Sequence, residues 1–184
     1  MGNDKNRVFI ALNPPEVLKS DIAGLIDILQ QNSKGIKWVK PDGFHLTLHF
    51  LGYLEEETIK KVKNMMAGIS GTFGRMEFKI GGINAFPDLD NPRVIFLEFE
   101  QEKSDPAVEL QKELGRGLAR LGIEINKRIW TPHITLGRVK DNFQLSIFNY
   151  QLKKRKFFIE SFELMESKLS KEGAKYKELA SFKL

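Results

Sequence analysis

The stretch HLTLHFLG (His45–Gly52) alternates polar and apolar side chains with the period of two that is typical of a β-strand. About half the chain later, PHITLGR (Pro132–Arg138) repeats the same order of residue types. Both stretches contain His-x-Thr-Leu, in which alternation sends the histidine and the threonine to one face and the aliphatic residues to the other. We therefore expect two similar strands, spaced as an internal duplication would leave them.

Chance is a poor explanation for this repeat. The chain has only three histidines and five threonines among 184 residues. A threonine two positions after two of three histidines arises by chance in roughly one of several hundred such chains. A single His-x-Thr on a strand is usually no more than a half-buried polar face, so only the pair points to a shared site.

Outward from the two motifs, the sequence predicts strands interleaved with helices. Turn signals such as Pro41-Asp42-Gly43 join some strands directly, so the sheet is not purely parallel and the fold class is mixed α and β. The predicted strands are Arg7–Asn13, Ile36–Lys40, Phe44–Tyr53, Arg75–Phe86, Arg93–Glu100, Ile129–Lys140, Lys156–Leu169 and Tyr176–Lys183. The predicted helices are Glu16–Gln31, Glu55–Ile69, a helix capped by Ser104 that runs to Leu121, and a short one at Phe143–Tyr150.

Length and composition favour one globular domain over residues 1–184. The formal charge of +5 and the isoelectric point near 9.3 suit an anionic partner. With no cysteine, the chain has neither disulfides nor thiolate catalysis nor cysteine-ligated metal sites. The polar start of the chain is unlike a signal peptide, and no apolar run is long enough to cross a bilayer. We expect a cytoplasmic, soluble protein without a membrane partner, and a monomer.

If the two motif strands are neighbours, their polar faces present two imidazoles and two hydroxyls to one space. His45 and His133 could then act as general acid and general base near neutral pH. Thr47 and Thr135 could donate hydrogen bonds to phosphate oxygens, and Arg138 adds a charge-assisted contact. This set predicts cleavage of a phosphodiester without a metal or other cofactor.

Other readings of the same residues are weaker. His45 and His49 would suit zinc on a helix, but four residues along a strand separate them by roughly 13 Å. We therefore expect His49 in solvent or at the rim of the substrate site. No glycine-rich phosphate loop and no nucleophile elbow has the required spacing. The basic run Lys153–Lys156 is predicted to be a solvated turn that helps to attract RNA.

These motifs resemble the two-histidine phosphoesterase superfamily, and within it the bacterial and archaeal RNA 2′,3′-cyclic phosphodiesterases, also called 2′-5′ RNA ligases. The resemblance extends over nearly the whole chain and departs from the family pattern in neither His-x-Thr motif. It rests on RVFIALNPP (7–15), HLTLHFLG (45–52), FPDLDNPRVIFLEF (86–99), PHITLGR (132–138) and FELMESKLSKEGAKYKEL (162–179). It implies a bilobal α+β fold, with two pseudo-symmetric lobes that each carry an antiparallel sheet and outer helices, and an active site in the cleft between them.

The resemblance also implies the reaction and the role of each residue. RNA 2′,3′-cyclic phosphate ends are hydrolysed to 2′-phosphates, with His45 as proton donor and His133 as proton acceptor. Thr47, Thr135 and Arg138 match phosphate- or substrate-binding positions. Phe50 stands five residues after His45, as Arg138 does after His133. Strict alternation would turn both toward the core, so we predict a bulge or bend in each strand that lets Phe50 stack on a base.

Alternatives of a different class stay open at this point. The same cleft could belong to a nucleotide- or RNA-binding module without catalysis, although binding alone needs no acid–base pair. A related phosphodiesterase that acts on another cyclic phosphate, such as ADP-ribose 1″,2″-cyclic phosphate, or that trims RNA 3′ ends, would carry the same motifs. Reverse 2′-5′ ligation of RNA ends is a further activity that the motifs do not separate from hydrolysis.

Overall fold

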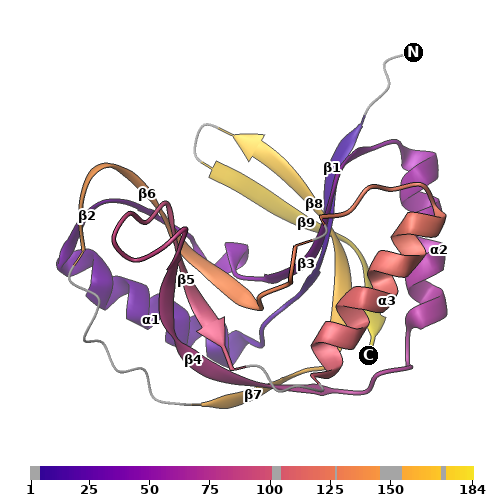
Figure 1. Cartoon of the computed structure of the whole chain (residues 1–184), viewed down its shortest axis with the longest axis horizontal. Coiled ribbons are helices and arrows are strands. Elements are labelled where there is room, and N and C mark those ends of the chain that lie inside the picture. The colour runs from indigo at the N-terminus through magenta and orange to yellow at the C-terminus, as the bar shows by residue number, and fades with distance from the viewer. Residues whose placement is uncertain (1–4, 101–104, 127, 146–154, 171–172) are drawn as a thin grey trace.

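The computed structural model describes residues 5–100, 105–126, 128–145, 155–170 and 173–184 (Figure 1). Its helices are α1 (Glu16–Gln31), α2 (Glu56–Ile69) and α3 (Pro106–Arg120), with a 3₁₀ turn η1 (Pro41–Gly43). Its strands are β1 (Asn6–Leu12), β2 (Ser33–Trp38), β3 (Leu46–Leu54), β4 (Met76–Phe86), β5 (Val94–Phe99), β6 (His133–Leu145), β7 (Lys156–Ile159), β8 (Ser161–Ser170) and β9 (Gly173–Lys183). The α+β prediction is confirmed.

The strands form one curled antiparallel sheet in the order β7-β4-β5-β6-β3-β1-β8-β9, with β2 paired to β6. Most neighbours share a long register, but β3 and β6 share the single pair Leu46–Ile134. The sheet therefore consists of two halves that meet at this seam. One half holds β2, β4, β5, β6 and β7, and the other holds β1, β3, β8 and β9.

Helices cover each half from outside (Figure 1). α1 packs against β2 and η1, whereas α2 and α3 pack together over β9 and β3. The apolar positions of these amphipathic helices join the inner faces of the strands in one core. Fully buried members include Ile10, Leu46, Leu97, Leu110 and Phe162. No helix in the described part of the chain is long and apolar enough to span a membrane.

Four predicted elements need correction. The strand predicted over Ile129–Lys140 begins only at His133, where pairing with β5 starts, and residues 129–132 are not strand. The cap of α3 is Asp105, whose side chain accepts a hydrogen bond from the amide of Ala107; Ser104 lies outside the described residues. Residues 143–145 are strand rather than helix, because β6 continues along β2 as far as the pair Ser33–Leu145; the remainder of that predicted helix lies outside the described residues. The predicted strand Lys156–Leu169 is two strands.

The division of that strand follows from its partners. β7 pairs with β4 in one half of the sheet, and β8 pairs with β1 and β9 in the other. In the basic run predicted as a solvated turn, Lys156 is instead the first residue of β7 and forms an ion pair with Glu77 at 2.9 Å. Arg155 forms an ion pair with Asp21, with 2.7 Å between Nη1 and Oδ2. Residues 153–154 lie outside the described part of the chain.

The predicted irregularities in both motif strands are confirmed. Along β1, the register passes from Thr47 to His49 and from Phe50 to Gly52, which leaves Leu48 and Leu51 as extra residues in β3. Along β5, it passes from Thr135 to Gly137, which leaves Leu136 extra in β6. A bulge moves every later side chain to the opposite face of its strand. Phe50 is accordingly 64% exposed rather than buried in the core.

Candidate active site

His45 lies between η1 and β3, enclosed by aromatic rings from the same half of the sheet. The centroid of its ring is 4.8 Å from that of Phe9 on β1 and 4.9 Å from that of Tyr176 on β9. This burial lowers the pKa of His45 to about 4; a hydrogen bond to the backbone of Gly43 opposes the shift, and the nearby charge of His133 adds to it. In the free protein His45 is therefore a neutral imidazole at pH 7.

His133 is the first residue of β6 and has an equivalent setting in the other half. Its ring centroid is 5.1 Å from that of Phe96 on β5 and 5.2 Å from that of Phe86 on β4. Its Nδ1 is 2.7 Å from the carbonyl oxygen of Thr131, two residues upstream, just as Gly43 is two residues upstream of His45. Burial lowers the pKa of His133 as well, again against the effect of the backbone hydrogen bond.

The carbonyl contact determines which nitrogen of His133 can react. An Nδ1–H that donates to Thr131 leaves Nε2 as the free nitrogen of the neutral ring. Nε2 can then accept a proton, or donate one when the ring is charged. A ring held in one tautomer and one orientation is what a general acid or base requires.

The seam between β3 and β6 brings the two motifs together. The antiparallel pair Leu46–Ile134, continued by one residue on each side, puts Thr47 across from His133 and His45 across from Thr135. Each histidine thus faces the threonine of the other motif. Thr47 is also held from the neighbouring segment, since the indole Nε1 of Trp130 donates to its carbonyl oxygen at 2.7 Å.

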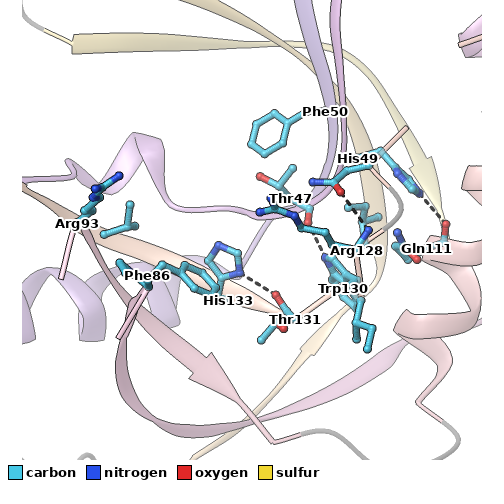
Figure 2. A pocket seen from close by; sticks show the side chains of 15 residues that line it. Thr47, His49, Phe50, Phe86, Arg93, Gln111, Arg128, Trp130, Thr131 and His133 are labelled. Carbon is cyan, nitrogen blue, oxygen red and sulfur yellow. Dashed lines mark hydrogen bonds between the residues drawn. The ribbon is translucent and has the colours of Figure 1, made fainter. Parts of the chain in front are cut away.

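A cavity of about 580 Å³, here called the histidine cavity, opens beside this seam (Figure 2). Of the six predicted site residues, Thr47, Phe50 and His133 line it, while His45, Thr135 and Arg138 do not. Figure 2 shows Phe50 on one side of this space and His133 with Phe86 on the other. The remaining walls carry two arginines, Arg93 and Arg128, and this volume suffices for a nucleotide-sized ligand.

Thr135 and Arg138 lie on β6 beside the cavity. Thr135 pairs with Phe96, whose ring contacts His133, and Arg138 pairs with Val94, which lines the cavity. Side chains of directly paired residues leave a sheet on the same face. The exposed side chain of Arg138 therefore starts from the cavity face of the sheet.

Of the two places expected for His49, solvent is wrong; the residue lines the histidine cavity, and its contact at the rim of the substrate site stays a prediction. Its side chain is 4% exposed, and its Nε2 lies 2.7 Å from the carbonyl oxygen of Gln111 on α3. The extra residue Leu48 turns His49 away from the face of Thr47 and toward the helix. Burial lowers its pKa, against the effect of the bond to Gln111.

Several residues that shape the site escaped the sequence analysis. Phe86 and Tyr176 were assigned to strands without a role, although each contacts a motif histidine. Arg128 and Trp130 lie in a segment without regular structure, although Trp130 falls within the strand predicted over Ile129–Lys140, and only their residue types could have signalled a site. Among the described residues, no group of three or more histidine, aspartate and glutamate side chains is arranged to hold a metal ion.

Comparison with known proteins gives a consistent result. The family of LigT-like phosphoesterases matches residues 12–96. A Thermotoga maritima protein named RNA 2′,3′-cyclic phosphodiesterase is 30% identical over 176 residues, 94% of this chain and 92% of that protein. One of the same name from Methanocaldococcus jannaschii is 34% identical over 134 residues, 73% of this chain and 72% of its own length.

Solved structures agree with these relatives. A crystal structure of a Thermus thermophilus protein superposes with a TM-score of 0.82 at 26% identity, covering 97% of both chains. The structure of E. coli LigT complexed with 3′-AMP has the same fold, with a TM-score of 0.78 at 21% identity over 98% of this chain and 99% of that one. Two histidines on duplicated strands, the arrangement of the halves and the similarity along the whole chain agree, and this protein belongs to the LigT-like phosphoesterase family.

Proposed function

We propose that this protein hydrolyses the 2′,3′-cyclic phosphodiester at the end of an RNA to a 2′-phosphomonoester. The observation that carries the proposal is the meeting of two His-x-Thr strands at one seam beside the histidine cavity, each histidine across from the other's threonine. Its relatives from Thermotoga maritima and Methanocaldococcus jannaschii are named RNA 2′,3′-cyclic phosphodiesterase. A binding module would need no acid–base pair.

In the proposed reaction, a water molecule attacks phosphorus opposite the 3′-oxygen. His133 accepts a proton from this water at Nε2, and the resulting hydroxyl forms the new P–O bond. The bond between phosphorus and the 3′-oxygen breaks, and His45 supplies the proton that makes this oxygen a hydroxyl. The 2′-oxygen keeps the phosphate. Each proton transfer contributes on the order of 10²–10⁴-fold to the rate.

The other site residues act on charge and orientation. Thr47 and Thr135 donate hydrogen bonds to the non-bridging oxygens, where negative charge grows in the transition state. The guanidinium of Arg138 binds the same phosphate, and Phe50 stacks on the terminal base. Phe50 is suited to this role because it is exposed and faces the cavity.

The low pKa of His45 is compatible with its role as the acid once substrate is bound. A phosphodiester anion between the rings favours the protonated form of both histidines. This effect is largest where water screens least, at the enclosed ring of His45. We expect substrate binding to raise the pKa of His45, so that the ring takes up the catalytic proton when the phosphodiester is bound.

The remaining expectations belong to the same proposal. The reaction needs no metal or cofactor, because two imidazoles suffice for both proton transfers. The two halves work as one domain over residues 1–184, since each contributes one histidine, and the protein acts as a cytoplasmic monomer. Joining of 2′,3′-cyclic and 5′-hydroxyl RNA ends, the 2′-5′ ligase reaction, is a side activity in which an RNA 5′-hydroxyl replaces water as the nucleophile on phosphorus and the 3′-oxygen again leaves as a hydroxyl.

A metal-free incubation tests this proposal. A short RNA ending in a 2′,3′-cyclic phosphate is incubated with the protein in EDTA, and 2′- and 3′-phosphate products are separated by chromatography. We expect the 2′-phosphate alone. A 3′-phosphate would mean that the other P–O bond breaks and that the histidine roles are reversed. Tight nucleotide binding without any product would favour the non-catalytic binding module.

A further inference from the structure

The histidine cavity does not end at the seam. A groove of about 610 Å³, here called the α3 groove, runs between α3 and residues 125–126 and 128–130. The two spaces share six lining residues, namely His49, Gln111, Asn126, Arg128, Ile129 and Trp130. Figure 2 shows the histidine cavity alone, and in it the lining passes from His133 by Thr47, Trp130 and Arg128 to Gln111 on α3, where the shared residues begin the groove.

The walls of the α3 groove are positively charged. Lys112 and Arg116 stand four residues apart on one face of α3, and Arg128 extends from the opposite wall. The described residues offer Arg128 no acidic partner for an ion pair. The partners of the helix cations, Glu109 and Glu113, are not among the residues that line the groove.

Those helix ion pairs do not prevent phosphate binding. Both are solvent-exposed pairs three residues apart, a kind that contributes little to stability and exchanges readily. Apolar surface lies next to the cations: Ile129 is 95% exposed, and Trp130 lines the same wall. A groove lined by both cations and apolar side chains suits single-stranded nucleic acid, which presents both phosphates and bases.

We infer that the α3 groove binds the nucleotides of the RNA strand that precede the terminal cyclic phosphate. This inference rests on the proposed function. An RNA that ends in a 2′,3′-cyclic phosphate extends in one direction only, so a groove continuous with the histidine cavity receives the upstream strand. The protein is then an enzyme for oligonucleotides, and a cyclic mononucleotide occupies only part of its site.

The experiment compares two substrates and three proteins. The substrates are a cyclic mononucleotide, adenosine 2′,3′-cyclic phosphate, and a five-nucleotide RNA ending in the same group. The proteins are the wild type, the double variant Lys112→Gln/Arg116→Gln, and the control Lys61→Gln. Lys61 is a matched control because it is also an exposed helix cation with a glutamate partner, Glu57, but it lies on α2.

We expect the double variant to lose roughly tenfold in kcat/KM on the pentanucleotide, mostly through KM, when two phosphate contacts disappear. Hydrolysis of the mononucleotide stays at the wild-type rate. The slope of log(kcat/KM) against log salt concentration on the pentanucleotide becomes shallower by about 1.4, or roughly 0.7 for each contact. The control matches the wild type on both substrates.

Three outcomes would overturn the inference. If the wild type hydrolyses both substrates and the double variant keeps its pentanucleotide kcat/KM and salt slope, the groove does not bind RNA, although the proposed function stands. If kcat/KM of the double variant falls by the same factor on both substrates, the substitutions act on the histidine cavity or on the fold and not on the groove. If the wild type hydrolyses neither substrate, the proposed function fails first, and the inference fails with it.

Discussion

The two halves of the sheet carry the same motif in unequal surroundings. His45 and His133 each have a backbone carbonyl two residues upstream and two aromatic rings within about 5 Å. Yet His133 lines the histidine cavity and His45 does not, and it is His45 whose pKa falls to about 4. A repeated motif therefore supplies two chemically similar groups, and the tertiary surroundings make them different enough for different roles.

The sharpest test of this difference is to remove each histidine. His45→Ala and His133→Ala should each lower turnover of the cyclic RNA end by about 10²–10⁴-fold, because each deletes one proton transfer. Turnover is measured under steady-state conditions, with thermal unfolding as a check of the fold. Unchanged turnover in the double variant would remove the basis of the assignment.

A modified substrate then separates the two roles. When sulfur replaces the 3′-bridging oxygen, the leaving group departs as a thiolate and needs no acid. Activity should return in His45→Ala and stay low in His133→Ala. The opposite pattern would make His133 the acid.

The threonines test whether the two halves share the phosphate equally. Thr47→Val and Thr135→Val keep the shape of the side chain but remove its hydroxyl donor. Each substitution should lower kcat by about 10²-fold. This is the lower end of the range of about 10²–10³ for the loss of one hydrogen-bond donor to an oxygen that gains charge in the transition state. Thr58→Val on α2 is a control of the same chemistry away from the site. Loss in only one of the two site variants would show that one half alone binds the phosphate.

The stability of the fold should depend on pH through His45. The unfolded chain binds a proton on this residue near pH 6.5, whereas the folded protein binds it near pH 4. The contribution of His45 to the free energy of unfolding is therefore fully present above pH 6.5 and is lost as the pH falls toward 4. Its size is up to about 3 kcal/mol.

Urea unfolding of the wild type and His45→Gln at pH 7 and pH 4.5 measures this contribution. The variant should lose less stability between the two pH values than the wild type does. His49 and His133 act in the same direction, and Glu163, whose pKa burial raises, acts in the opposite one. The comparison with the variant cancels these other groups, so equal losses would contradict the prediction.

The smallest expected effect comes from opening the enclosure of His45. Tyr176→Ala should raise the pKa of His45 from about 4 toward 6.5, because water reaches the ring and stabilises its charge. Tyr176→Phe keeps the ring and should keep the pKa low. NMR titration of the imidazole carbon-bound protons reads both values, and an equal pKa in the two variants would locate the cause elsewhere.

Much of the fold could be predicted from local pattern. α1 begins and ends where the sequence predicts, because a proline pair precedes it and its apolar positions have helical spacing. Local pattern failed at residues 143–145, which are strand and not the predicted helix, and at residues 129–132 and Glu160, which are not the predicted strand. Pairing of β6 with β2, of β7 with β4 and of β8 with β1 decides these boundaries. Hydrophobic periodicity indicates which face of a segment is buried in the core, but it does not identify the strand that pairs with that segment.

By itself the sequence determined that two His-x-Thr strands exist, that the histidine and threonine of each motif share a face, and that cysteine chemistry is absent. Only the tertiary structure decided that the strands meet at Leu46–Ile134, that the bulge at Leu48 buries His49 against α3, and that Tyr176 encloses His45. The physical reason is range. Alternation is set by neighbouring residues, whereas a pKa, a cavity and a charged groove depend on segments that are distant in sequence and adjacent only after folding.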